Sequence, residues 1–217
     1  MSIFNKKRIG LFPLEVVLFP ESMLPIYVFE RKYINLINKT IATDGQFGIN
    51  LSYAYKFYNI GCTASILDIK HHQDEDTYDI LVIGKQRYKI VDYKESSEKY
   101  NIGEIEIIDD DVETIDYSIL DKCIEIYNKI TEEIKITKIE KIDYGKLSVQ
   151  YPSYYIAQKS GLTLAQRQKL LETTSENKRL LIIQKHLESM LPMIKEAEFI
   201  TQLVRNDGYY IPKIDNI

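Results

Sequence analysis

The chain has 217 residues, of which 45% are hydrophobic, so it can form one large domain or two small ones with a sizeable core. Its formal net charge of −4 argues against a non-specific nucleic-acid binder, because such proteins need an excess of Lys and Arg to neutralise phosphates. No apolar run approaches the length of about 18 residues that marks a membrane span. The N-terminal run is broken by Pro13 and Glu15 and lacks a signal-peptide cleavage site. We therefore expect a cytoplasmic protein with no membrane partner.

Three of the six prolines, Pro13, Pro20 and Pro25, lie in the stretch 11–31 and divide it into short extended pieces. Proline cannot donate to a β-ladder, so none of these pieces can be a long central strand. The near-continuous apolar runs 16–19 and 26–29 indicate segments buried on both faces. Together these features predict a small closed or partly closed barrel.

The rest of the first half alternates between helical and strand spacing. Asp44-Gly45 gives a stop after the first helix, and residues 53–59 form an expected loop rich in tyrosine. Residues 71–76 are polar throughout and predict the tip of a long hairpin, and Gly84-Lys85-Gln86 is expected to turn the chain. The predicted elements are a helix at 30–43 and strands at 46–52, 60–70, 78–83, 87–93 and 104–108.

After residue 110 the spacing of apolar residues becomes helical. Helices are predicted at 115–136, at 144–159 with a flaw at Pro152, at 164–172 with Thr163 as N-cap, and at 176–191 with a boundary at Pro192. The tail from Gly208 shows no period. We therefore expect an α+β chain with a β-rich subdomain at 1–112, an α-helical subdomain at 113–200 and a C-terminal tail at 201–217.

Motifs for catalysis and cofactor binding are absent from the sequence. It holds no P-loop, no G-x-G-x-x-G, no H-E-x-x-H and no G-x-S-x-G, so we expect neither an enzyme nor a cofactor. His71 and His72 lie near Asp74, Glu75 and Asp76, but neighbouring residues on a strand point to opposite faces, which favours a solvated hairpin tip over a metal site. His186 is expected to be a packing or surface residue. Cys62 and Cys123 fit neither a disulfide framework nor a metal quartet and are expected to be buried free thiols.

Tyrosine is abundant, with 17 residues and no tryptophan. One cluster holds Tyr53, Tyr55, Phe57 and Tyr58, and another holds Tyr151, Tyr154 and Tyr155. Aromatic side chains with a polar atom are favoured where a surface binds another chain. The alternative, which we favour from composition alone, is that tyrosine replaces Phe and Trp in cores and rims.

Several segments, taken in order, resemble the Lon N-terminal domain, the substrate-recognition part of the ATP-dependent Lon proteases. The resemblance spans residues 8–195 and implies a PUA-like β pseudo-barrel with one helix, followed by an α-helical bundle. The segments that carry it are Leu11–Leu14, Val17–Pro20, Leu24–Arg31, Phe47–Ile49, Ile60–Ala64, Leu81–Gly84, Gln86–Ile90, Glu104–Ile107, Leu162–Glu172 and Arg179–Ile183.

The 217 residues contain no AAA+ ATPase module and no Ser–Lys protease domain, so the resemblance implies a stand-alone, non-enzymatic, adaptor-like module. Its expected partners are unfolded or exposed hydrophobic polypeptide segments and the Lon protease system. Arg31 and Arg87 match family positions, although an arginine can also tie loops together through its five donors. The candidate peptide-binding residues are Tyr27, Phe29, Arg31, Tyr53, Tyr55, Phe57 and Tyr58.

Two alternatives stay open. One is an RNA-binding protein with a PUA-like fold, which the negative charge and the absence of an RNP-like signature disfavour. The other is an enzyme whose site is assembled from residues distant in sequence.

Overall fold

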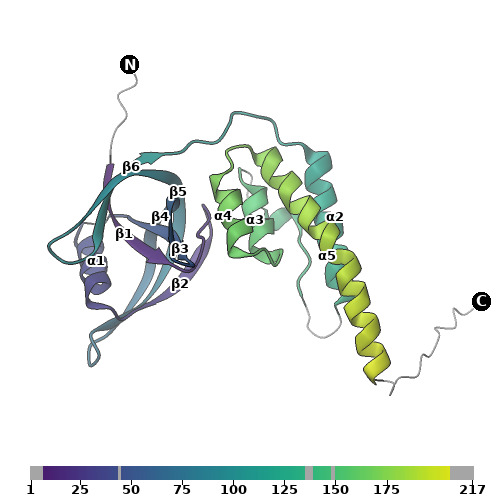
Figure 1. Ribbon diagram of the computed structural model, residues 1–217, viewed down its shortest axis with the longest axis horizontal. Coiled ribbons are helices and arrows are strands. Elements are labelled where there is room, and N and C mark those ends of the chain that lie inside the picture. Colours follow the sequence, from purple (N-terminus) through teal and green to yellow (C-terminus); the bar gives the residue numbers. More distant parts are fainter. Residues whose placement is uncertain (1–6, 44, 135–138, 148–149, 206–217) are drawn as a thin grey trace, which may run out of the picture. The chain divides into compact units, whose positions relative to one another are not determined.

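The computed structural model describes residues 7–43, 45–134, 139–147 and 150–205 (Figure 1). Contacts divide these residues into two units, which are described separately. The first, the barrel unit, comprises residues 7–113 and 162–176; the second, the helical unit, comprises residues 114–161 and 177–205. Residues 162–176 thus group with the strands, whereas the division expected from sequence placed them with the other helices. The expected stop at Asp44 and the tail from Gly208 lie outside the described residues.

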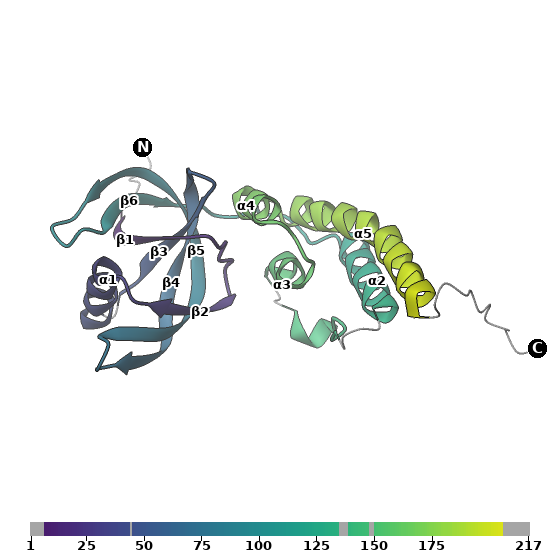
Figure 2. The same ribbon diagram turned by 60° about the horizontal axis from the view of Figure 1, so that its bottom comes forward.

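The strands of the barrel unit form a six-stranded pseudo-barrel, and α1 (Arg31–Ala42) packs on it (Figure 2). The strand order is β2-β5-β4-β3-β1-β6, and β6 pairs back onto β5, which closes the ring. Among the strand pairs of the described residues, only β1 and β3 run parallel. This closure confirms the predicted barrel. The strands are β1 (Lys7–Leu14), β2 (Met23–Val28), β3 (Phe47–Tyr53), β4 (Lys56–His72), β5 (Thr77–Glu95) and β6 (Asn101–Ile107).

Strand β5 is 19 residues long and serves two parts of the sheet. Its first part pairs with β2 and its last part with β6, while β4 lies along most of it. The turn expected at Gly84-Lys85-Gln86 is therefore wrong. Gly84 lies inside β5, and the Phe19 carbonyl approaches it so closely that a Cβ at this position would clash. The glycine therefore marks a close backbone approach and not a turn.

The proline-rich opening stretch differs in part from expectation. Val17, Leu18 and Phe19 are buried, as predicted, but they lie in irregular backbone between β1 and β2. The run 26–29 is not buried on both faces: Ile26 and Val28 point into the core, and the residues between and after them are exposed. One face of β2 therefore lies at the surface of the barrel unit.

The core of the barrel unit consists of two layers of apolar side chains, one on each side of the sheet. The larger layer gathers α1 residues such as Ile34 and Ile37 with residues from β1 to β5. The smaller layer surrounds Tyr88, whose hydroxyl donates to the Oδ1 atom of buried Asn50. Gly48 and Gly61 leave the room that this ring occupies. Burial raises the pKa of Tyr88 well above its usual value, so the phenol stays neutral.

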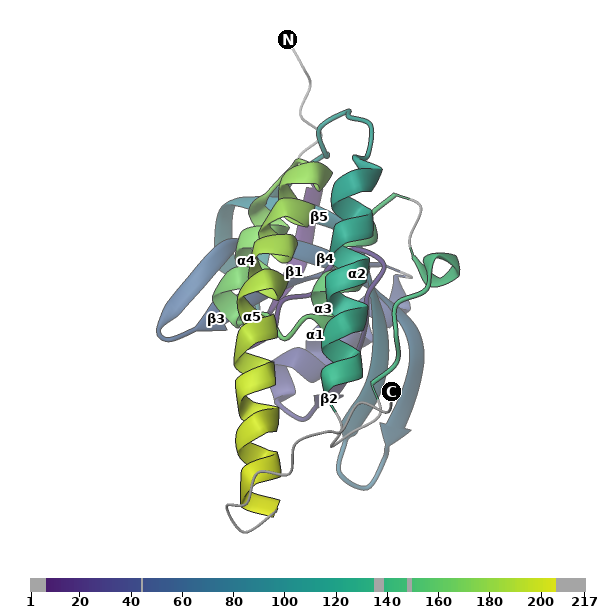
Figure 3. The same ribbon diagram turned by 90° about the vertical axis from the view of Figure 1, so that its right-hand side faces the viewer.

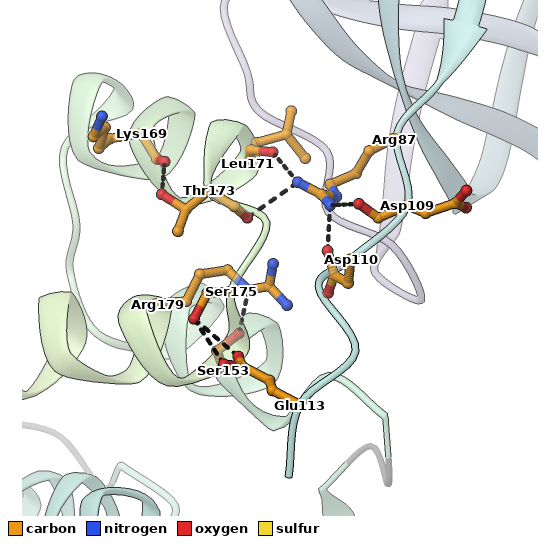
Figure 4. A network of polar contacts seen from close by, with 10 residues as sticks. All are labelled: Arg87, Asp109, Asp110, Glu113, Ser153, Lys169, Leu171, Thr173, Ser175 and Arg179. Atoms are coloured by element: carbon orange, nitrogen blue, oxygen red, sulfur yellow. Dashed lines mark hydrogen bonds and ion pairs between the residues drawn. The ribbon is translucent and has the colours of Figure 1, made fainter. Parts of the chain in front are cut away.

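Helix α4 (Leu164–Glu172) is attached to the strands of its own unit by buried polar contacts. It begins at Thr163 with a capping box to Gln166, which confirms the predicted N-cap. At its other end the guanidinium of Arg87, a β5 residue that is 3% exposed, donates to the carbonyls of Leu171 and Thr173 at 2.9 and 3.0 Å (Figure 4). The same group pairs with Asp110, which follows β6. Arg87 thus ties segments together, the role that its five donors allow.

The helical unit contains α2 (Tyr117–Glu133), the short η1 (Tyr144–Lys146), α3 (Pro152–Lys159) and α5 (Glu176–Arg205). Helices α2 and α5 run side by side in the same direction (Figure 3). Their starts meet where the Asp116 N–H donates to Asn177 at 2.8 Å, and further along the Cys123 thiol donates to the Leu180 carbonyl at 3.3 Å. Both cysteines are buried and free, as predicted.

Two helix predictions in this unit are wrong. The stretch 144–159 is not one helix, because Pro152 occupies the first turn of α3, where a missing N–H costs nothing. Helix α5 does not end at Pro192 but continues through it to Arg205. Helix α2 ends at Glu133, whereas the sequence predicted a helix to residue 136; residues 135–136 lie outside the described part of the chain.

Candidate functional site

The seven candidate residues fall into two groups within the barrel unit, and the structure does not bring the groups together. Tyr27, Phe29 and Arg31 lie on β2 and at the start of α1, beside the hairpin that joins β4 to β5. The other four, Tyr53, Tyr55, Phe57 and Tyr58, surround the turn between β3 and β4. The hairpin and the turn lie at opposite ends of the 17-residue strand β4.

The first group belongs to a row of exposed apolar side chains. Along β2 the inward positions Leu24, Ile26 and Val28 alternate with exposed ones, as the period of a half-buried strand requires. Met23 is 63% exposed, Tyr27 50% and Phe29, just after the strand, 64%. We call the exposed row the β2 stripe; its members are Met23, Pro25, Tyr27 and Phe29.

Strand β2 lies at one end of the strand order and, among the described residues, pairs with β5 only. Pro25 is opposite Leu81 of β5. Because proline has no N–H to give, it is tolerated on such an edge strand and not in the centre of a sheet. The β2 stripe therefore combines exposed apolar side chains with an unpaired strand edge, a surface that proteins usually protect or use for binding.

The two aromatic rings of the stripe are held in place by neighbours. The Tyr27 hydroxyl lies 3.3 Å from both Glu75 Oε2 and Thr77 Oγ1, on the β4–β5 hairpin. The Phe29 ring stacks against the Tyr27 ring with centroids 5.9 Å apart. Rings held in this way lose little conformational entropy when a partner covers them.

Charged groups surround these rings on the hairpin side. Arg31 pairs with Asp76, whose carboxylate also accepts from His71 Nε2 at 3.3 Å. The hydrogen bond from His71, followed by that from Arg31, lowers the pKa of Asp76. His72 donates instead to Asp79 at 2.7 Å. The two histidines thus use different carboxylates, and no group of three or more His, Cys, Asp or Glu side chains is placed to hold a metal ion in the described part of the chain.

The second group lies on a tight hairpin and not in the expected loop. Ala54 and Tyr55 both have positive φ, at 51° and 63°, as the central residues of a type I′ turn require. Tyr53 and Tyr55 are exposed, but Phe57 packs against Tyr93 and the smaller core layer. Tyr58 is covered by the ammonium of Lys56, 4.2 Å from its ring centroid. Strands β3 and β4 both lie inside the strand order, and their pairing with β1 and β5 stops short of the turn, where residues 52–53 and 56–57 pair with each other.

Sequence reasoning missed Met23, Pro25 and Glu75 as parts of the surface around Tyr27. The available signal was Pro25, because a proline inside a strand marks an edge and an edge strand has one open side. Glu75 could not be paired with Tyr27 before the hairpin register was known, since 48 residues separate them.

The described residues offer little for acid–base or nucleophilic chemistry. Burial raises the pKa of the Cys62 thiol to about 12, which keeps it neutral and unreactive. His186 donates to the Ser160 carbonyl at 2.8 Å, a packing contact within the helical unit. Among the described helices, none is long and apolar enough to cross a membrane.

The chain thus combines a closed β pseudo-barrel, which carries an exposed apolar edge strand, with a helical unit. Residues 8–189 match the family described as the ATP-dependent protease La (LON) substrate-binding domain. The chain therefore belongs to this family, as its sequence motifs implied.

Curated relatives and solved structures agree with this assignment. The Lon protease of Dictyoglomus thermophilum is 23% identical over 89% of this chain, and that of Buchnera aphidicola is 27% identical over 91%. The chain spans about a quarter of the length of these relatives, 26% and 27% respectively.

Two solved structures share the fold. The N-terminal domain of a Mycobacterium avium complex Lon protease aligns with a TM-score of 0.67 and 21% identity, over 85% of this chain and all of that one. A Lon N-terminal domain protein from Xanthomonas campestris aligns with a TM-score of 0.63 and 20% identity, over 80% of this chain and 95% of that one.

Proposed function

We propose that this chain is a non-enzymatic module that recognises exposed apolar segments of unfolded polypeptides through the β2 stripe. The family is described as a substrate-binding domain, and the curated relatives are named Lon proteases, whose substrates are polypeptides. From the same relationship we also propose an adaptor-like role beside a Lon protease in the cytoplasm.

The observation that carries this proposal is the alternation along β2, which leaves Met23, Tyr27 and Phe29 half exposed or more on the same outward face. Contiguous exposed apolar side chains on a soluble surface mark interaction sites more often than single ones do. Tyrosine and phenylalanine are also enriched in interfaces because they bury much area at low entropic cost.

The turn between β3 and β4 is the weaker candidate of the two. Phe57 and Tyr58 already have neighbours that cover them, which leaves Tyr53 and Tyr55 as the free aromatic surface. This pair makes a matched control for the stripe, because it offers two exposed aromatic side chains in the same unit.

The test measures binding of unfolded segments to the full chain. An array of 12-residue peptides tiled from unfolded proteins selects a binder, and fluorescence anisotropy then gives its Kd for the wild type and two double variants. Covering two half-exposed rings contributes about 1.4 kcal/mol or more, so we expect Tyr27→Ser with Phe29→Ser to weaken binding at least tenfold. Tyr53→Ser with Tyr55→Ser should leave the Kd within about twofold. The opposite pattern, or no binding to any peptide at high micromolar concentration, would refute the proposal.

A further inference from the structure

The direction of the backbone groups of β2 follows from its pairing with β5. The Gly84 N–H donates to the Ser22 carbonyl at 2.9 Å, and the register continues with Met23 opposite Ile83. Hydrogen-bonded and non-hydrogen-bonded positions alternate in an antiparallel pair. The even-numbered residues of β2 therefore bond to β5, whereas Met23, Pro25 and Tyr27 direct their backbone groups away from it.

Pro25 is the one residue of β2 without an N–H, and it lies at a position that does not bond to β5, so no hydrogen bond to β5 is lost. The N–H groups of Met23 and Tyr27 and the carbonyls of Met23, Pro25 and Tyr27 face the open edge. The same residues carry the outward side chains of the β2 stripe. An extended chain laid along this edge would meet backbone donors, backbone acceptors and apolar side chains at one period.

The charge around the edge indicates what kind of segment would dock there. The cations around this edge are Arg31, Lys32 and Lys70, which lies opposite Asp79 on β4. Five carboxylates outnumber them, so the net charge of these groups is −2 with the histidines neutral. The carboxylates near Tyr27 and the hairpin are Glu30, Asp74, Glu75, Asp76 and Asp79. The exposed faces of Tyr27 and Phe29 also favour cations by cation–π attraction. A segment with Lys or Arg complements this rim, and an acidic one does not.

We infer that β2 accepts an extended segment, apolar at alternate positions and flanked by Lys or Arg, as an added antiparallel strand. This inference rests on the proposed function and specifies its mode: backbone pairing at the β2 edge in addition to apolar contact. In an antiparallel pair, residues directly opposite each other place their side chains on the same face. The apolar residues of the bound segment therefore lie opposite Met23, Pro25 and Tyr27 and direct their N–H groups toward β2.

That geometry gives a test on the peptide and leaves the protein unchanged. The probe is the heptapeptide acetyl-Lys-Val-Thr-Val-Thr-Val-Lys-amide, with its Kd measured by isothermal titration against the full chain. N-methylation of the central valine removes an N–H directed at β2, and we expect it to weaken binding at least tenfold. N-methylation of a threonine alters an N–H on the far side, and binding should stay within about threefold. A loss caused by threonine methylation alone would overturn the antiparallel placement.

A second arm tests the charge. Replacing both lysines of the heptapeptide with glutamate should weaken binding about fivefold or more in low salt, and equal binding would overturn the assignment of a basic segment.

The results also separate this inference from the proposed function. If both methylated peptides bind like the parent while the stripe variant loses binding, apolar recognition stands and strand addition is wrong. If neither the heptapeptide nor any tiled peptide binds, both are wrong.

Discussion

Replacement of Arg87 by methionine should destabilise the barrel unit strongly, because the guanidinium is buried and joins three segments (Figure 4). It donates to the carbonyls of Leu171 and Thr173 and pairs with Asp110, whose side chain is also largely buried. Removing one partner of a buried charged network costs about 3–5 kcal/mol. Lysine at this position keeps the charge but not the planar fork, so we expect Arg87→Lys to cost less than methionine and more than a surface change.

A matched control is Arg31→Met, because Arg31 also pairs with an aspartate but is 73% exposed. Exposed pairs contribute about 0–1 kcal/mol. Urea unfolding followed by circular dichroism gives the free energy of unfolding for both variants, and amide hydrogen exchange over residues 164–172 reports whether α4 opens separately. The reasoning is refuted if Arg87→Met costs no more than Arg31→Met, or if exchange in α4 is unchanged.

Three further predictions concern other parts of the fold. Burial raises the pKa of the Cys62 thiol from 9.0 to about 12, so between these pH values the thiol ionises only in the unfolded state. The contribution of this thiol to the free energy of unfolding is complete below pH 9 and falls by about 1.4 kcal/mol per pH unit up to about pH 12. Urea unfolding at a series of alkaline pH values checks this, and a Cys62→Ala variant with the same slope would contradict it. Gly84→Ala should lower the free energy of unfolding by about 1–3 kcal/mol, because the new Cβ would clash with a backbone carbonyl. The control is Gly145→Ala, where the nearest atom to the new Cβ would lie 3.9 Å away, and it should change the free energy of unfolding by less than about 0.5 kcal/mol. Equal effects of the two substitutions would argue against the close approach at Gly84. Pro192→Ala should stabilise the helical unit by about 1–3 kcal/mol, since proline inside α5 removes a backbone hydrogen bond; an unchanged or lower thermal midpoint would contradict that account.

Local signals in the sequence predicted the elements that local interactions determine. Thr163 and the residues after it predicted the start of α4, because a cap and its partner lie within one turn. The polar run 71–76 predicted the β4–β5 hairpin for a similar reason. The turn predicted at Gly84 was wrong because this glycine allows a close contact with the backbone of Phe19. Phe19 lies 65 residues earlier in the chain, so no local sequence pattern indicates the contact.

The candidate surface was predictable only in part. Tyr27 and Phe29 were named from their residue types, but the run 26–29 was expected to be buried on both faces. Whether an apolar strand has one neighbour or two depends on the order of strands in the sheet, and the sequence does not state that order. Likewise, the sequence suggested that Arg87 ties segments together, but it did not identify the acceptors. These are carbonyls at the end of α4, more than 80 residues away in the chain.

The most direct test of the central claim is nuclear magnetic resonance mapping of the barrel unit in the full chain during titration with a peptide selected from the tiled array. We expect the largest chemical-shift changes at the amides of residues 23–29 and 74–79. Changes confined to residues 53–58, or spread evenly without a maximum at β2, would contradict the account.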